Sequence, residues 1–238
     1  MKSCCDVVSV KGETRMNTLF LLYEGNCSKY DVDKVRVDDN SILKGKHICF
    51  LGSSVTKGFG SLDVSFVEFL AKENGFTYTK EAVNGTTLVN DKKDSYVNRL
   101  YELDKNESYD CFVIQLSTND ASKGKELGFS SSSFDDETVC GAINTIISYI
   151  EKNYHCPILF YTNLHYENER YRQMVSLLHE IEKTRKIFVL DLYSDKDFNE
   201  RLSQNRSLYM VDDIHPTKAG YLKMISPKMK EKLSEMMK

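Results

Sequence analysis

Short apolar runs alternate with helical patterns along most of this chain. Five runs rich in β-branched and aromatic residues are predicted to be strands: residues 47–51, 77–83, 111–117, 157–162 and 187–192. Between them, apolar residues recur at helical spacing, as in residues 66–74 before Gly75 and in residues 139–150. Strands that alternate with helices are typical of a doubly wound, parallel α/β sheet with helices on both faces.

Residues 1–46 do not follow this alternation. The segments "TLFLLYEG" and "DKVRVDD" resemble strands of an added hairpin. We therefore expect a small N-terminal β extension over residues 1–45 and one α/β domain over residues 46–238. The last segment, from Thr217 onward, is predicted to be helical, and Pro227 should kink or split it.

Composition narrows the class of protein. The net charge of −3 gives no global field that would recruit nucleic acid, so no nucleic-acid partner is expected. No apolar run approaches the length of a membrane span. The seven cysteines are scattered, which favours reduced thiols and a cytoplasmic location. Cysteine, histidine and carboxylate residues lack the spacing of a metal site, so no metal or other cofactor is expected.

Polar residues gather where predicted strands end. Gly52-Ser53-Ser54 follow the first strand, Asn84-Gly85-Thr86-Thr87 the second, and Ser117-Thr118-Asn119-Asp120 the third. Ligands of parallel sheets bind at the carboxyl ends of the strands, so these segments should meet at one edge. A fourth segment, residues 209–221, places Asp212 three residues before His215, close enough for the carboxylate to bind one imidazole nitrogen.

These groups match the needs of acyl-transfer chemistry. A serine hydroxyl needs a neighbouring base to take its proton, and an acid must hold that base in the right tautomer. Ser54, His215 and Asp212 can fill these three roles. The oxyanion needs donors in place, which the backbone N–H groups of Ser54 and Gly85 and the side-chain amide of Asn119 can supply.

The four segments resemble the conserved blocks of the SGNH, or GDSL-type, hydrolases. Gly52 to Thr56 resemble the serine block, Asn84-Gly85 the glycine block, Thr118-Asn119-Asp120 the asparagine block and Asp212 to Pro216 the histidine block. The resemblance extends over about residues 46–238. It implies a three-layer α/β/α, flavodoxin-like fold with a central five-stranded parallel sheet, and ester hydrolysis through an acyl-enzyme.

Two positions depart from the pattern of that family. Ser53 stands where the family usually has Asp, and Ser117 stands where it usually has Gly. Two adjacent serines then compete for the role of nucleophile, and we assign it to Ser54 from its spacing to Gly52 and Thr56. Ser53 itself, and His165 after the fourth strand, are predicted to contact substrate.

The substrate is expected to be a small-molecule ester, with a small acyl group or an acetylated carbohydrate as the candidates. Residues 121–134 are expected to overhang the site and to select among them. An alternative is a non-catalytic protein that binds a small molecule or mononucleotide on the same fold. However, Lys57 precedes Gly58 and Phe59 follows it, which reverses the order of a P-loop, and that alternative gives Asn119 and His215 no purpose.

Overall fold

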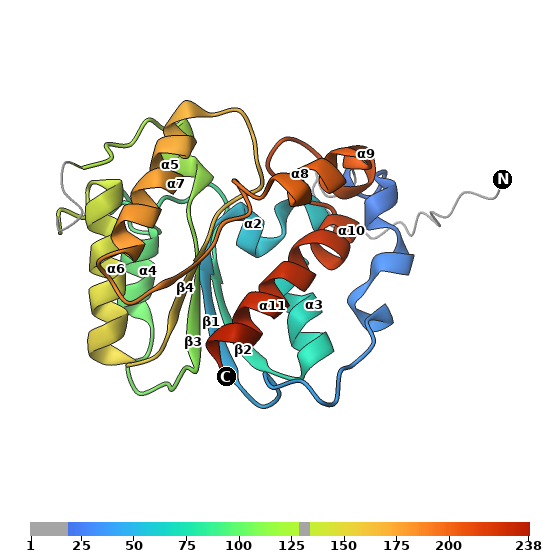
Figure 1. Ribbon diagram of the computed structural model, residues 1–238, viewed down its shortest axis with the longest axis horizontal. Helices are drawn as coiled ribbons and strands as arrows, with labels where there is room; N and C mark the ends of the chain where they lie inside the picture. The colour runs from blue at the N-terminus through green and yellow to red at the C-terminus, as the bar shows by residue number, and fades with distance from the viewer. Residues whose placement is uncertain (1–18, 129–133) are drawn as a thin grey trace.

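A parallel sheet of five strands forms the centre of the computed structural model, which describes residues 19–128 and 134–238 (Figure 1). The strands lie in the order β2-β1-β3-β4-β5, and every neighbouring pair is parallel. Their bounds are β1 His47–Gly52, β2 Thr77–Ala82, β3 Cys111–Gln115, β4 Ile158–Tyr161 and β5 Phe188–Leu190. The doubly wound fold and its five predicted strands are confirmed, each with small differences at the ends.

Helices cover both faces of the sheet (Figure 1). The α-helices are α2 Ser54–Lys57, α3 Phe66–Asn74, α4 Tyr96–Glu102, α5 Thr118–Ser122, α6 Val139–Asn153, α7 Glu169–Glu182, α8 Lys196–Ser203, α9 Arg206–Tyr209, α10 Lys218–Gly220 and α11 Ser226–Met236. Helices α4, α6 and α7 pack on one face, and α3 and α11 on the other. The predicted stop of α3 is confirmed, because Gly75 caps it in the left-handed conformation, with φ of 70°.

The covered faces explain why the inner strands β1, β3 and β4 consist mostly of consecutive apolar residues. In β1, Cys49 and Leu51 point toward α4, α6 and α7, whereas Ile48 and Phe50 point toward α3 and α11. All four side chains are fully buried. A strand with helices on both sides needs apolar residues at every position, because alternate side chains face opposite layers.

The expected N-terminal β extension is not found in the described part of residues 1–45. Residues 19–45 contain no strand; they form 3₁₀ turns, η1 Glu24–Asn26, η2 Ser28–Tyr30 and η3 Val32–Lys34. The apolar residues that suggested a hairpin serve another purpose, because Phe20 is buried against the domain while Leu22 and Val37 stay exposed. Single buried residues of this kind do not require the alternation of apolar and polar positions that a strand has.

The end of the chain differs from a simple broken helix. A π-helical stretch, η5 Tyr221–Ile225, joins α10 to α11, and Pro227 lies in the first turn of α11. Proline lacks an N–H group, so it fits the start of a helix better than its interior. In place of the predicted kink or split, the chain stays helical on both sides of Pro227, and the hydrogen-bond pattern changes from π-helical to α-helical just before it.

None of the helices in the described ranges has both the length and the apolar character that a membrane span requires. The cytoplasmic location stays a prediction.

Candidate active site

The loop that carries Ser54 is held from below by a side chain of β3. Gln115 Oε1 accepts hydrogen bonds from the backbone N–H groups of Ser53 (2.9 Å) and Thr56 (3.2 Å) and from Thr56 Oγ1 (2.9 Å). A Cβ atom at Gly52 would overlap Thr56 Oγ1, so glycine is needed where β1 turns into α2. The first residue of α2, Ser54, is therefore presented in a fixed position at the carboxyl end of the sheet.

Ser54, His215 and Asp212 form a chain of short hydrogen bonds. His215 Nε2 lies 2.8 Å from Ser54 Oγ, and His215 Nδ1 lies 2.7 Å from Asp212 Oδ2. The other carboxylate oxygen, Asp212 Oδ1, accepts the backbone N–H groups of Ile214 and His215, each at 2.7 Å. The carboxylate thus binds its own loop and the imidazole ring together, which sets the orientation of the ring.

The charge of Asp212 favours one tautomer of His215. Partial burial raises the pKa of Asp212, but the hydrogen bond from the His215 ring, its charge interaction with that ring and the backbone N–H groups of Ile214 and His215 outweigh burial and hold the pKa below its ordinary value. An ionised carboxylate can only accept, so Nδ1 must carry a proton. Nε2 is then free to accept the proton of the Ser54 hydroxyl group.

Two of the predicted oxyanion donors, Asn119 and Gly85, lie in segments near the hydrogen bonds of Ser54, His215 and Asp212. Asn119, in α5, directs its Nδ2 to Thr86 O at 3.0 Å and to Ser53 Oγ at 3.2 Å. Gly85 has a φ of 76°, a backbone conformation that residues other than glycine rarely adopt. Its carbonyl accepts a hydrogen bond from Lys123 Nζ at 2.6 Å, which helps to orient this loop.

Both departures from the family pattern have a structural role here. Ser117 is fully buried; its hydroxyl group donates to Thr86 O (3.2 Å) and accepts from the N–H of Asn119 (3.1 Å). Ser53 is also fully buried, and its hydroxyl group accepts from Asn119. The substrate contact predicted for Ser53 is not available in this conformation, because its side chain is fully buried and accepts the hydrogen bond from Asn119.

His165 follows β4, and its surroundings are aromatic. Its ring lies 4.8 Å from the ring of Tyr193, and its backbone N–H donates to Asn199 Oδ1 at 3.0 Å. The side chain is exposed. A contact between His165 and substrate stays a prediction. The segment 121–134, expected to overhang the site, includes residues 129–133, which lie outside the described residues.

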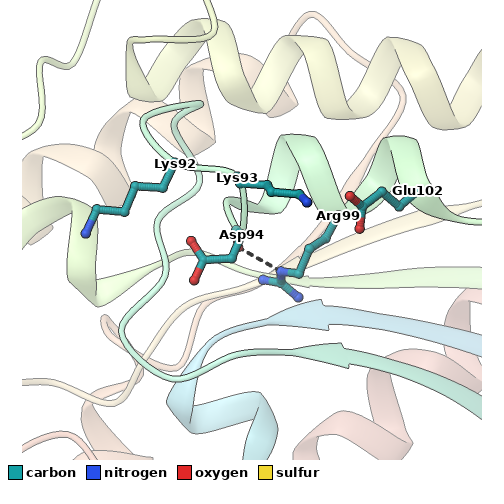
Figure 2. A pocket seen from close by; sticks show the side chains of 5 residues that line it. All are labelled: Lys92, Lys93, Asp94, Arg99 and Glu102. Atoms are coloured by element: carbon teal, nitrogen blue, oxygen red, sulfur yellow. Dashed lines mark hydrogen bonds between the residues drawn. The ribbon is translucent and has the colours of Figure 1, made fainter.

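Arg99 ties the loops beneath the site together. From α4 it donates to Gly52 O at 2.8 Å, to Thr86 Oγ1 at 3.2 Å and to Asp94 O at 3.0 Å, and also to Glu81 O. Figure 2 shows its guanidinium group reaching under the loop that precedes α4. The side chain borders a surface hollow of about 550 Å³, which is lined by Lys92, Lys93, Asp94, Arg99 and Glu102. Because the guanidinium group of Arg99 already binds three backbone oxygens and the Thr86 hydroxyl group, we assign it a structural role.

Sequence reasoning missed two residues that build this site. Gln115 is the single polar residue of β3, within an otherwise apolar run, and this was a signal that could have been used. Arg99 occurs in an ordinary amphipathic helix and gives no such signal. Within the described residues, no three His, Cys, Asp or Glu side chains are grouped so that they could hold a metal ion.

Comparison with known proteins gives a family and a fold. A sequence model of the GDSL-like lipase/acylhydrolase family matches residues 48–227. None of the curated proteins is significantly similar in sequence. A solved structure from Lactobacillus plantarum is 21% identical with a TM-score of 0.69, covering 81% of this chain and 98% of that one. Axe2, an acetylxylan esterase from Geobacillus stearothermophilus, is 17% identical with a TM-score of 0.57, covering 81% and 96%. At these identities the two structures support the fold alone.

Proposed function

Because this chain belongs to the GDSL-like lipase/acylhydrolase family, and is thus a carboxylic ester hydrolase, we propose that Ser54, His215 and Asp212 are its catalytic triad. The observation that carries this proposal is the unbroken chain of hydrogen bonds from Ser54 Oγ through both nitrogens of His215 to Asp212, at 2.8 and 2.7 Å. A nucleophile, a base and an orienting acid in this arrangement match the requirements of acyl transfer.

The first half of the reaction forms an acyl-enzyme. His215 Nε2 takes the proton from Ser54 as Oγ attacks the carbonyl carbon of the ester. Asp212 remains ionised and stabilises the imidazolium that results. The imidazolium then gives its proton to the departing alcohol oxygen, and the acyl group stays on Ser54.

The negative oxygen of the tetrahedral intermediate needs hydrogen-bond donors. We assign these to the backbone N–H groups of Ser54 and Gly85 and to Asn119 Nδ2. Asn119 holds its weaker hydrogen bond, at 3.2 Å, to Ser53 Oγ. An oxyanion would replace that hydroxyl group as the acceptor, because a hydrogen bond to a charged oxygen is stronger than one to a neutral oxygen.

The second half of the reaction returns the enzyme to its starting state. Water takes the place of the alcohol, His215 removes one of its protons, and the resulting hydroxide attacks the acyl carbon. The carboxylic acid leaves and Ser54 regains its proton from His215. The scheme uses only groups of this chain and water.

The proposed substrates are esters with small acyl groups, including acetylated carbohydrates. The support is the similarity in fold to Axe2, which is named for its action on acetylated xylan. A series of p-nitrophenyl esters from acetyl to decanoyl, followed by acetylated xylo-oligosaccharides, would define the preference. Hydrolysis that rises steadily toward the decanoyl ester would contradict the small-acyl proposal.

The two adjacent serines provide the sharpest test of the site. Ser54→Ala should abolish hydrolysis and covalent labelling by a fluorophosphonate probe. Ser53→Ala is the matched control; it should keep the labelling, because Ser53 is buried and its hydroxyl group binds Asn119, whereas His215 Nε2 binds Ser54. Loss of activity in Ser53→Ala with retention in Ser54→Ala would refute the assignment.

A further inference from the structure

A short N-terminal segment lies against the loops of the triad, although the family match begins only at residue 48. We call residues 19–34 the clamp segment. Its first 3₁₀ turn, η1, lies beside α9 and α10, which flank the loop that carries His215, and η3 lies beside α3 (Figure 1). Gly25 is packed so tightly there that a Cβ atom would collide with Leu208 O and Thr217 Oγ1. The segment is therefore fitted to the loop by shape.

Asn26 links the two catalytic loops through its side chain. Its Nδ2 donates to Gly60 O at 2.9 Å, and its Oδ1 accepts the N–H of Lys218 at 2.9 Å. Gly60 comes six residues after Ser54, and Lys218 three residues after His215. Nδ2 also donates to Phe20 O at 2.9 Å, within the clamp segment. Asn26 is buried, at 4% exposure, so these hydrogen bonds do not compete with water.

Two aromatic residues of the clamp segment reinforce this link. The Phe20 ring lies 5.1 Å from the Phe59 ring, edge to face, and the Phe59 ring lies 4.9 Å from the imidazole of His215. The hydroxyl group of Tyr23 donates to Val211 O at 3.2 Å, at the start of the histidine loop. The clamp segment thus supports the imidazole indirectly, through Phe59, and binds the backbone of the histidine loop at Val211.

We propose that the clamp segment is a positioning element of the active site, and that Asn26 is its central positioning residue. It holds the loop of His215 at the distance from Ser54 that proton transfer requires. The inference rests on the proposed function of Ser54 and His215. Asn26 acts through those residues and does not touch substrate.

The reason such a clamp matters is the distance along the chain between the reacting groups. Ser54 and His215 are 161 residues apart, and their hydrogen bond is 2.8 Å long. In the core, Tyr221 OH donates to Val55 O at 2.7 Å and joins the same two regions. Asn26 adds a second link between them. Displacement of a catalytic group by about 1 Å can lower a rate by about a hundredfold, so loss of this link should affect turnover.

The test measures turnover per active site in the full chain. Active sites of wild type and Asn26→Ala are counted by titration with a fluorophosphonate probe, and hydrolysis of p-nitrophenyl acetate is measured on untreated aliquots of the same preparations. We expect Asn26→Ala to be labelled to the same final fraction as wild type. Its kcat per labelled site should fall by about ten- to a hundredfold with KM within about twofold. Asn40→Ala, at an exposed position outside the clamp segment, is the matched control and should equal wild type.

Other outcomes separate the alternatives. A lower labelled fraction with unchanged kcat per labelled site would overturn the proposal, because Asn26 would then only stabilise the fold. If Asn26→Ala does not fold, Tyr23→Phe decides: we expect its kcat to fall about threefold, and an unchanged value would overturn the proposal. An inactive wild type would instead refute the proposed function itself.

Discussion

Replacing Asp212 by Asn tests the electrostatic logic of the site with almost no change in shape. The amide oxygen of Asn can still accept the backbone N–H groups of Ile214 and His215, which Asp212 Oδ1 accepts at 2.7 Å in the wild type. The amide nitrogen then faces His215 Nδ1 in place of Oδ2. Because an amide NH₂ only donates, Nδ1 must become the acceptor and the ring proton must move to Nε2.

The size of the effect follows from this change of tautomer. With a proton on Nε2, His215 can no longer accept the proton of Ser54 Oγ, which lies 2.8 Å away. A triad with the wrong tautomer loses about 10⁴-fold in kcat, or about 5 kcal/mol of transition-state stabilisation. The backbone hydrogen bonds are retained, so the free energy of unfolding should change by less than about 1 kcal/mol.

Hydrolysis of p-nitrophenyl acetate at pH 7.5, with urea unfolding on the same samples, measures both quantities. Asp213→Asn is the matched control: the neighbouring carboxylate is highly exposed and pairs with Arg206 at 2.8 Å. Its kcat should stay within about twofold of wild type, since exposed ion pairs contribute little. A kcat for Asp212→Asn within tenfold of wild type, or an equal loss in Asp213→Asn, would refute the reasoning.

Three more predictions concern the support of the site. Asn119→Ala should lower kcat by about 10²- to 10³-fold with little change in KM, and a loss confined to KM would argue against its oxyanion role. Gly52→Ala should reduce the free energy of unfolding by about 1–3 kcal/mol, because its Cβ overlaps Thr56 Oγ1; urea unfolding midpoints equal to wild type would contradict this. Burial raises the pKa of Asp120 to about 6, despite the N–H groups of Leu88 and Val89. The pKa of Asp120 is higher in the folded chain than in the unfolded chain, so the protonated carboxyl group stabilises the fold. This stabilisation is fully present below about pH 4 and is lost as the pH rises through about 6. Wild type should therefore lose about 3 kcal/mol relative to Asp120→Asn across that range, and a flat difference would contradict the assignment.

The sheet was predictable because each strand and helix carries its own periodic signal. The four residues from Cys111 to Ile114 are apolar because helices cover both faces of β3. Residues 19–45 were predicted less well. Phe20, Tyr23 and Asn26 hold that segment by separate contacts with residues far along the chain, and such contacts leave no periodic pattern in the sequence.

The sequence by itself determined which chemical groups reach the carboxyl edge of the sheet, because parallel strands bring their ends together whatever the details of packing. It also placed Asp212 and His215 within one loop, a contact between residues three apart. Only the tertiary structure decided which of two adjacent serines meets the imidazole, that Ser53 is buried under Asn119, and that Asn26 joins the two catalytic loops. These contacts join residues tens to nearly two hundred positions apart. They depend on side-chain packing in three dimensions, which no local pattern records.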